Sequence, residues 1–181
     1  MIEADRQVQL EACIPDIWNH DSYLYVGANE KRFHFKEKLR QLALCGDLMV
    51  DVVEANPDNI SFLNKQTWIR EVCNDDIRSF AFNGGYPWMD GYDVIIWSHG
   101  PTCLDTKDLA EQTIQFLKKV SKLIVIMCPW GLYPESQDKK SYYDINKFAL
   151  YPYFFEQLGF ETNTLGSPDV AGSNLLAWYR K

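Results

Sequence analysis

The sequence lacks the features that define several large classes of proteins. Its five cysteines are widely separated with no Cys-x-x-Cys pair, and its three histidines have no metal-ligand spacing. This pattern is typical of reduced, mostly buried thiols, and we expect no metal site. No apolar run approaches membrane-spanning length, and the beginning MIEADRQVQLEACIPD is too acidic and polar for a signal peptide. We therefore expect a cytoplasmic protein with no membrane partner.

An excess of positive charge is missing as well. The formal net charge is −7, which argues against a nucleic-acid backbone as the partner. Internal repeats and low-complexity tracts are also absent. The 181 residues are 46% hydrophobic, so the chain can bury a substantial core in a domain of ordinary size.

Apolar, strand-like segments alternate with helical patterns from residue 23 onward. Such near-continuous apolar strands predict a parallel sheet covered on both faces, with helices in right-handed crossovers. The last two strand-like segments have no helix between them, which predicts an antiparallel hairpin at the edge of the sheet. We predict one α/β domain over residues 22–181, preceded by a helical segment, 1–21, that could act as a lid. The predicted strands are 23–26, 48–55, 68–75, 92–99, 122–128, 158–166 and 174–181.

Three helical patterns connect these strands. The first covers residues 32–44 and stops at Gly46, and the second opens with Asn56 as cap and Pro57 in its first turn. In the third, between the fourth and fifth strands, Asp105 and Asp108 suit the N-terminus and lysines suit the C-terminus.

Glycine is scarce in the loop where a dinucleotide site would need it. The loop after the first strand has Gly27, but Asn29 and Arg32 occupy the other glycine positions of G-x-G-x-x-G. Arg32 would obstruct close helix–strand packing, and Glu30 would repel a pyrophosphate. An NAD-dependent oxidoreductase is therefore disfavoured. A ligand with an adenosine but no phosphate meets neither obstacle, and Asn29 tolerates left-handed backbone angles.

Acidic residues follow the second and third strands. Glu54 is placed to accept hydrogen bonds from both hydroxyls of a ribose, as in many nucleotide-binding sheets. Asp76 is placed to accept from an adenine amino group while the Ile77 N–H meets a ring nitrogen, with Asp75 as the reserve. The alternatives are a helix-capping role for Glu54 and a solvated strand end at the two aspartates, and Gly27 alone is also typical of an ordinary turn.

These segments together resemble the class I S-adenosylmethionine-dependent methyltransferases, from about residue 22 to the C-terminus. The matching pieces, in order, are YVGAN, VVEANP, NDDIR, YDVIIWSHGP, IVIMCPWG and LGFET…NLLAWYRK. HGP and CPWG resemble a bacterial and archaeal branch of that family. The resemblance implies a Rossmann-like seven-stranded sheet whose last strand is antiparallel, with S-adenosylmethionine as cofactor. The cofactor-binding residues that it implies are Gly27, Ala28, Asn29, Glu54, Ala55, Asp76, Ile77 and Ser98.

The chain departs from the family pattern in the first loop. Tyr25 replaces the common acidic residue, and Asn29 and Lys31 replace further glycines. These departures favour the alternative that the chain is a non-catalytic, Rossmann-like binding or scaffolding module that has weakened or lost cofactor binding.

We expect the methyl acceptor to bind near the segments that follow the fourth and fifth predicted strands. His99 is placed to remove a proton from an attacking hydroxyl or amine, or to shape the site through the loop GPTCLD. Residues 129–155 are dense in aromatic side chains, typical of a substrate pocket and equally of a partner or homodimer surface. We expect methyl transfer to a small polar acceptor, with His99 catalytic and with Trp130, Tyr133 and Tyr143 in contact with the substrate.

Overall fold

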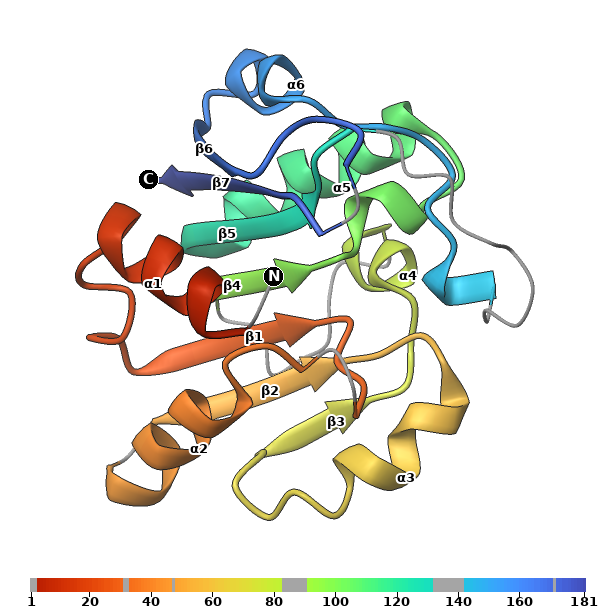
Figure 1. The fold of residues 1–181 in the computed structure, drawn as a ribbon. Coiled ribbons are helices and arrows are strands. Elements are labelled where there is room, and N and C mark those ends of the chain that lie inside the picture. Colours follow the sequence, from red (N-terminus) through yellow and green to blue (C-terminus); the bar gives the residue numbers. More distant parts are fainter. Residues whose placement is uncertain (1–2, 31–32, 47, 83–90, 132–141, 171) are drawn as a thin grey trace.

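A twisted sheet runs through the middle of the protein (Figure 1). The computed structural model describes residues 3–30, 33–46, 48–82, 91–131, 142–170 and 172–181. Within these residues the sheet has seven strands in the spatial order β3-β2-β1-β4-β5-β7-β6, which confirms the predicted α/β architecture. The strands are β1 Ser22–Val26, β2 Met49–Val53, β3 Glu71–Cys73, β4 Tyr92–Ser98, β5 Ser121–Pro129, β6 Glu161–Leu165 and β7 Asn174–Arg180.

The strand directions follow the lengths of the connections. The first five strands pair in parallel and are joined by crossovers that contain helices. Only residues 166–173 separate β6 from β7, too few for a crossover, so the two strands pair antiparallel. β7 also pairs antiparallel with β5, which completes the predicted C-terminal hairpin.

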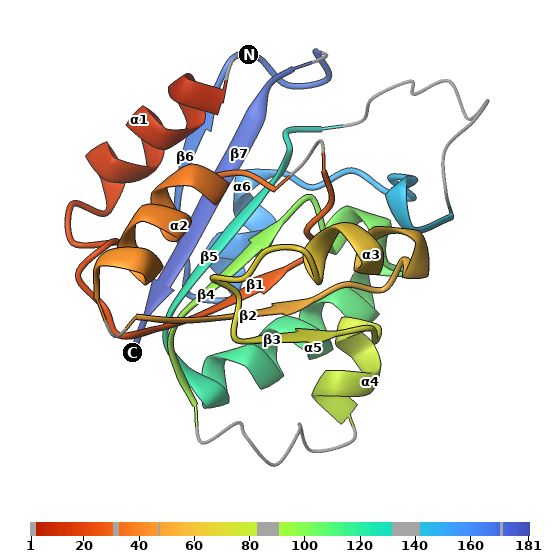
Figure 2. The same ribbon diagram turned by 90° about the horizontal axis from the view of Figure 1, so that it is seen from below.

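Helices cover both faces of the sheet (Figure 2). One hydrophobic cluster joins the sheet to α1, α2 and α3, and a second cluster joins the opposite face to α4, α5 and α6. Neighbouring β1 side chains alternate between the two clusters, as Leu24 and Tyr25 do, because successive side chains of a strand point to opposite faces. The helices are α1 Glu3–Cys13, α2 Lys36–Cys45, α3 Ile60–Leu63, α4 Ile77–Phe82, α5 Lys107–Val120 and α6 Pro152–Gln157, with 3-10 turns at Pro57–Asn59, Pro101–Cys103 and Tyr142–Asp144.

Local capping signals explain most helix starts. The Asn56 side chain accepts from the Asp58 N–H at 3.1 Å and opens the 3-10 turn before α3. α5 begins at Lys107, because Thr106 caps it and accepts from the Leu109 N–H, and Asp108 lies in its first turn as predicted. α6, with Pro152 in its first turn, begins inside the aromatic-rich stretch 129–155, for which no helix was predicted, and ends at Gln157.

The N-terminal helix is part of the core. Leu10, Ile14 and Ile17 in or just after α1 are fully buried, and they pack in the cluster that contains Tyr23 and Tyr25. Gln9 donates to Asn163 at 2.9 Å and accepts from the Asn174 amide at 3.0 Å, which links α1 to the edge hairpin. The division at residue 21 and the role of a lid stay predictions.

Two further expectations concern the whole chain. In the part of the chain that the structure describes, no helix combines the length and the apolar character needed to cross a membrane. All five cysteines are free thiols, but only Cys128 is buried, and Cys45 is exposed. The expectation of mostly buried thiols was therefore wrong, although none is paired.

Candidate active site

A pocket opens where the carboxyl ends of four parallel strands meet. Val26 at the end of β1 pairs with Val53 of β2 on one side and with Trp97 of β4 on the other, so the strand tips lie at one edge. The chain order reverses at β1, and such a switch point is where open α/β sheets bind ligands. The pocket is lined by residues 26, 27, 29, 53–55, 75–78, 97–100, 103, 104, 142 and 143.

Gly27 makes the tight turn at the centre of this edge. Its N–H continues the sheet by donating to the Val53 carbonyl at 2.9 Å, and its φ of 80° lies in the left-handed region. A Cβ atom at this position would lie 3.2 Å from the Ser98 carbonyl oxygen. Both the backbone angle and the close approach to β4 therefore favour glycine.

Glu54 follows β2 and is only 5% exposed, yet it lines the pocket. Its Oε1 accepts from the Asn56 N–H at 2.7 Å and from the Asn59 amide at 3.1 Å. These bonds fix the orientation of the carboxylate at the pocket wall. The capping alternative is thus present in the structure, and it coexists with a position that suits a ribose.

The aspartates after β3 are held by local hydrogen bonds. Asp75 accepts from the Asp76 N–H at 2.7 Å, and the Asp76 carboxylate accepts from the Arg78 guanidinium at 2.8 and 2.7 Å. Asp75, Asp76 and Ile77 all line the pocket. Arg78 was absent from the sequence prediction. The hydrogen bonds that it donates to the Asp76 carboxylate, and then the Asp105 carboxylate, raise the pKa of Arg78 and keep it a cation.

Asp105 joins three segments along one wall of the pocket. It accepts from the Lys147 ammonium at 2.5 Å, from the Tyr142 hydroxyl at 2.6 Å and from Arg78 at 2.7 Å. The hydrogen bonds from Lys147 and Tyr142 hold the pKa of the Asp105 carboxyl well below its usual range. This network fastens Tyr142, which lines the pocket, to the start of α5.

Ser98 is the last residue of β4, and His99 follows it. Ser98 lines the pocket and is 1% exposed as a residue, and its hydroxyl oxygen is buried with no hydrogen-bond partner among the described residues. His99 has a φ of 60°, a strained conformation that is most often found at functional sites. Its N–H donates to the Met127 carbonyl of β5 at 2.7 Å, and its carbonyl accepts from the Cys103 thiol.

The His99 side chain meets two other nitrogen-bearing side chains. Its Nε2 lies 3.0 Å from Arg6 Nη1 of α1 and 3.0 Å from Nε2 of His34, which follows the first loop. Arg6 Nη1 lies 2.5 Å from the same His34 nitrogen. All three residues are partly exposed. In this arrangement the imidazole contacts α1 and His34, and the loop GPTCLD is held instead through the His99 backbone.

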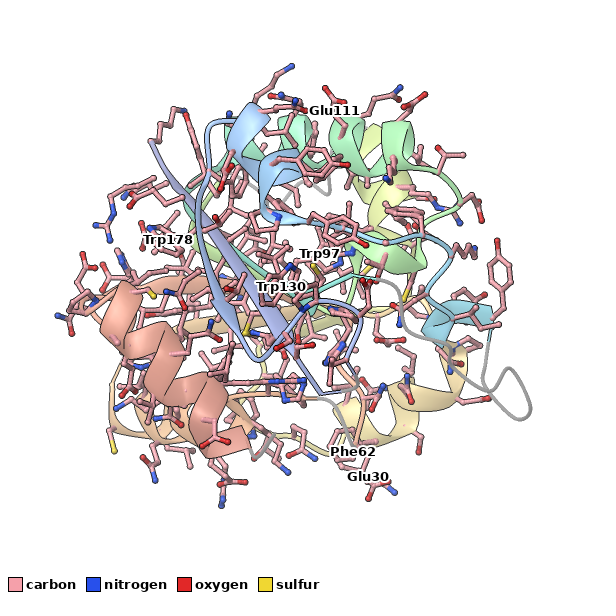
Figure 3. All side chains as sticks on the ribbon, turned by 45° about the horizontal axis from the view of Figure 1, so that its top comes forward. Glu30, Phe62, Trp97, Glu111, Trp130 and Trp178 are labelled. Atoms are coloured by element: carbon pink, nitrogen blue, oxygen red, sulfur yellow. The ribbon has the colours of Figure 1, made fainter. Side chains whose placement is uncertain are left out.

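The remaining predicted residues divide between the pocket and the core. Asn29, Ala55 and Tyr143 line the pocket. Ala28 is fully buried in the core below it, and Trp130 packs against the core cluster that contains Trp97 (Figure 3), so neither side chain belongs to the lining. Tyr133 lies outside the described residues, and its role as a substrate contact stays a prediction.

Besides Arg78, sequence reasoning did not single out Trp97, His34 or Arg6, which lie at or beside the pocket. Trp97 lines it above Gly100, where a Cβ atom would lie 1.3 Å from the indole nitrogen. This contact explains the glycine in HGP. His34 could have been found from sequence. It lies in the segment that follows β1, and segments that follow the parallel strands β1 and β4 meet at the same edge of the sheet. Arg6 had none, since only tertiary packing brings α1 to this edge. Tyr142 also lines the pocket, and it belongs to the aromatic stretch 129–155 that is typical of a substrate pocket.

No protein-family model and no curated protein matches the chain. Solved structures do match it across nearly its whole length. The N-methyltransferase NodS from Bradyrhizobium japonicum WM9, solved with S-adenosyl-L-homocysteine, has a TM-score of 0.65 at 13% identity, covering 98% of this chain and 86% of NodS. A putative S-adenosylmethionine-dependent methyltransferase from Listeria monocytogenes has a TM-score of 0.61 at 13% identity, covering 99% of each chain. TehB from Haemophilus influenzae has a TM-score of 0.60 at 15% identity, covering 98% of this chain, which spans 62% of the length of TehB.

These likenesses define the class of fold. The strand order and the inserted antiparallel β7 are shared with methyltransferase structures, and the chain has the class I S-adenosylmethionine-dependent methyltransferase fold. The predicted fold class is confirmed.

The turn at Gly27 predicts that alanine destabilises the protein more at position 27 than at position 46. Gly27→Ala should destabilise the protein by about 1–2 kcal/mol, the usual cost of a left-handed residue with a Cβ atom, and the new Cβ atom should press on the Ser98 carbonyl. Gly46→Ala is the matched control, because Gly46 has an extended φ of −155° and its Cβ atom would be in ordinary contact at 3.7 Å. Urea unfolding measures both variants, and equal stability of the two would contradict the assignment.

The lowered pKa of Asp105 predicts a pH-dependent contribution to stability. A carboxyl whose folded pKa lies below its unfolded value of about 4 stabilises the protein above that pH. The contribution is lost as the pH falls through the folded pKa. Asp105→Asn should therefore lower the melting temperature at neutral pH, and the difference from the unmodified protein should shrink below about pH 4.

Glu111→Gln controls for the loss of one negative charge, because Glu111 is exposed on α5, away from the pocket lining (Figure 3). A melting-temperature difference for Asp105→Asn that stays constant with pH, or that Glu111→Gln reproduces, would show that the network does not stabilise the wall.

Proposed function

We propose that the protein binds S-adenosylmethionine in the pocket at the strand tips and transfers its methyl group to a small polar acceptor. The observation that carries this proposal is that Gly27 and Glu54 line the same pocket. A tight glycine turn and a buried, oriented carboxylate follow neighbouring strands and line one pocket. The structural neighbours that were solved with S-adenosyl-L-homocysteine support it.

The pocket residues fit this cofactor. A ribose presents two hydroxyl donors, and Glu54 presents a carboxylate at the wall that can accept from them. The Ser98 hydroxyl is buried without a partner among the described residues, a state that costs free energy and that a polar ligand group would relieve. Val26, Val53 and Ile77 add apolar surface for an adenine ring.

Different residues of the pocket would contact different parts of the cofactor. Glu54 would hold the ribose, and Asp76 with Ile77 would meet the adenine. Arg78 already engages the Asp76 carboxylate, but a carboxylate has about four lone-pair sites and can accept a further donor. Gly27, Asn29, Ala55 and Ser98 would complete the cofactor site. When bound, S-adenosylmethionine supplies an activated methyl group, so the protein contributes mainly alignment and exclusion of water.

The acceptor side lies toward β4 and Tyr143. We keep His99 as the candidate base for a hydroxyl or amine acceptor, since it lines the pocket. Its Nε2 could take a proton only if Arg6 did not donate to that nitrogen. Tyr143, 40% exposed, stands at the wall beside Tyr142 with ring centroids 5.7 Å apart, where it could contact an acceptor.

Cofactor binding is the first test of the proposal. Calorimetric titration with S-adenosyl-L-homocysteine should give saturable heat, and Glu54→Gln should weaken the affinity by about 1–3 kcal/mol, the scale of a hydrogen bond to a charged group. The amide keeps one oxygen to accept from the Asn56 N–H, so the local turn should survive the change. Melting temperatures of both proteins check this.

Glu71→Gln is the matched control, because Glu71 is an exposed glutamate on β3 that does not line the pocket. Absence of heat at millimolar ligand would favour the non-catalytic module, and a rise in melting temperature with NAD alone would favour an oxidoreductase. Unchanged affinity in Glu54→Gln would remove Glu54 from the site.

A further inference from the structure

Tyr142 is a large aromatic side chain at the pocket to which the proposed function gives no role. It lines the pocket and is 55% exposed, in the segment that follows β5. Its hydroxyl donates to the Asp105 carboxylate at 2.6 Å, and the Lys147 ammonium lies 3.8 Å from the centroid of its ring. Neither Asp105 nor Lys147 belongs to the lining, so both contacts hold the ring from outside the pocket.

The segment that carries Tyr142 is attached to the residues that follow β4. The Lys147 N–H donates to the Thr102 carbonyl at 2.7 Å, and the Thr102 hydroxyl donates to the Asn146 side chain at 2.5 Å. Thr102 is fully buried, so both bonds attach the segment to the interior of the protein. The position of the Tyr142 ring is thus fixed by the backbone of its segment as well as by its own side-chain contacts.

A chain of hydrogen bonds connects Tyr142 to the end of the pocket that we propose for the adenine. Asp105 accepts from the Tyr142 hydroxyl and from the Arg78 guanidinium at 2.7 Å. Arg78 in turn donates to Asp76, the residue that would accept from the adenine amino group. Only one carboxylate and one guanidinium therefore separate the Tyr142 hydroxyl from Asp76.

Apolar side chains border the same part of the pocket. Leu104 directly precedes Asp105, and it lines the pocket together with Ile77. Leu104 and Ile77 are 7% and 6% exposed, and both belong to one hydrophobic cluster. A purine has two apolar faces and a polar edge. This part of the pocket offers apolar surface, a carboxylate for the edge, and an aromatic ring at Tyr142.

We propose that the ring of Tyr142 stacks on the adenine of the bound cofactor and forms one wall of its purine site. Every base has a π face that can stack on an aromatic side chain. Because the hydroxyl bond and the ammonium contact already fix the ring, little side-chain freedom is left to lose when a base binds. Asp105 and Lys147 are then positioning residues, since they act through the ring.

This inference rests on the proposed function for the identity of the cofactor. It assigns Tyr142 to the cofactor and not to the methyl acceptor, although the aromatic stretch 129–155 is typical of a substrate pocket. Tyr143 keeps its proposed contact with the acceptor.

Adenosine and S-adenosyl-L-homocysteine are the probes of this site, because both carry the adenine and only the second carries the amino-acid end. Calorimetric titration of the full chain measures the affinity for each. Tyr142→Ala should weaken both affinities by about fivefold to a hundredfold, the range expected for the loss of a base–aromatic stack. Tyr142→Phe keeps the ring and loses the bond to Asp105, so it should recover most of the lost affinity.

Tyr153→Ala is the matched control. Tyr153 is 54% exposed, lies in α6 and does not line the pocket. Its substitution should leave both affinities unchanged. Melting temperatures confirm that each variant is folded.

NMR of the protein with isotope-labelled tyrosine reads the contact directly. The chain has ten tyrosines, and the ring signal that is missing in Tyr142→Phe belongs to Tyr142. Adenosine should move that signal upfield, because a stacked ring lies in the ring current of the base. The Tyr153 signal, assigned in the same way from Tyr153→Phe, should stay in place.

The outcomes separate this inference from the proposed function. If S-adenosyl-L-homocysteine binds but the Tyr142 signal stays in place and Tyr142→Ala binds as tightly as the unmodified protein, the stack is overturned and the proposed function stands. Equal losses in Tyr142→Phe and Tyr142→Ala also overturn the stack, because the bond to Asp105 and not the ring would then matter. Adenosine that shifts the Tyr142 signal, without any binding of S-adenosyl-L-homocysteine, supports the purine site and overturns the proposed function instead. Binding of neither probe overturns both.

Discussion

The close passage of the chain at Gly27 is the constraint on which the site depends. The N–H of Gly27 bonds to the end of β2, and its Cα faces the Ser98 carbonyl at the end of β4 with room for no more than a tight Cβ contact. Two other residues that follow strands make the same kind of bond to a neighbouring strand. The Glu54 N–H donates to the Cys73 carbonyl of β3, and the His99 N–H donates to the Met127 carbonyl of β5. Gly27, Glu54 and His99 are thus each held by a hydrogen bond to the neighbouring strand, and the sheet keeps this part of the pocket wall rigid.

This rigid edge supports two opposite kinds of electrostatic environment. At β2 and β3, carboxylates are oriented by neighbouring N–H groups and by the Arg78 guanidinium. At β4, an arginine and two imidazoles converge on one point.

Much of the fold could be predicted from sequence because its signals are local. Apolar strand runs, the cap at Asn56 and the short connection before β7 each act over a few residues. The site was less predictable. Gly27, Glu54 and Ser98 lie at strand ends, which a parallel sheet brings to one edge. Ala28 packs into the core, and Trp130 packs against the core cluster that contains Trp97, outside the lining. The contacts of Arg6 depend on how α1 docks, which no local pattern encodes.

A crystal structure of the protein with S-adenosyl-L-homocysteine tests the central claim most directly. The account predicts density for the ligand beyond Gly27, with the ribose hydroxyls at the Glu54 carboxylate and the adenine toward Ile77. Density at another face, or a Glu54 carboxylate that meets only Asn56 and Asn59 while the ligand lies elsewhere, would contradict it.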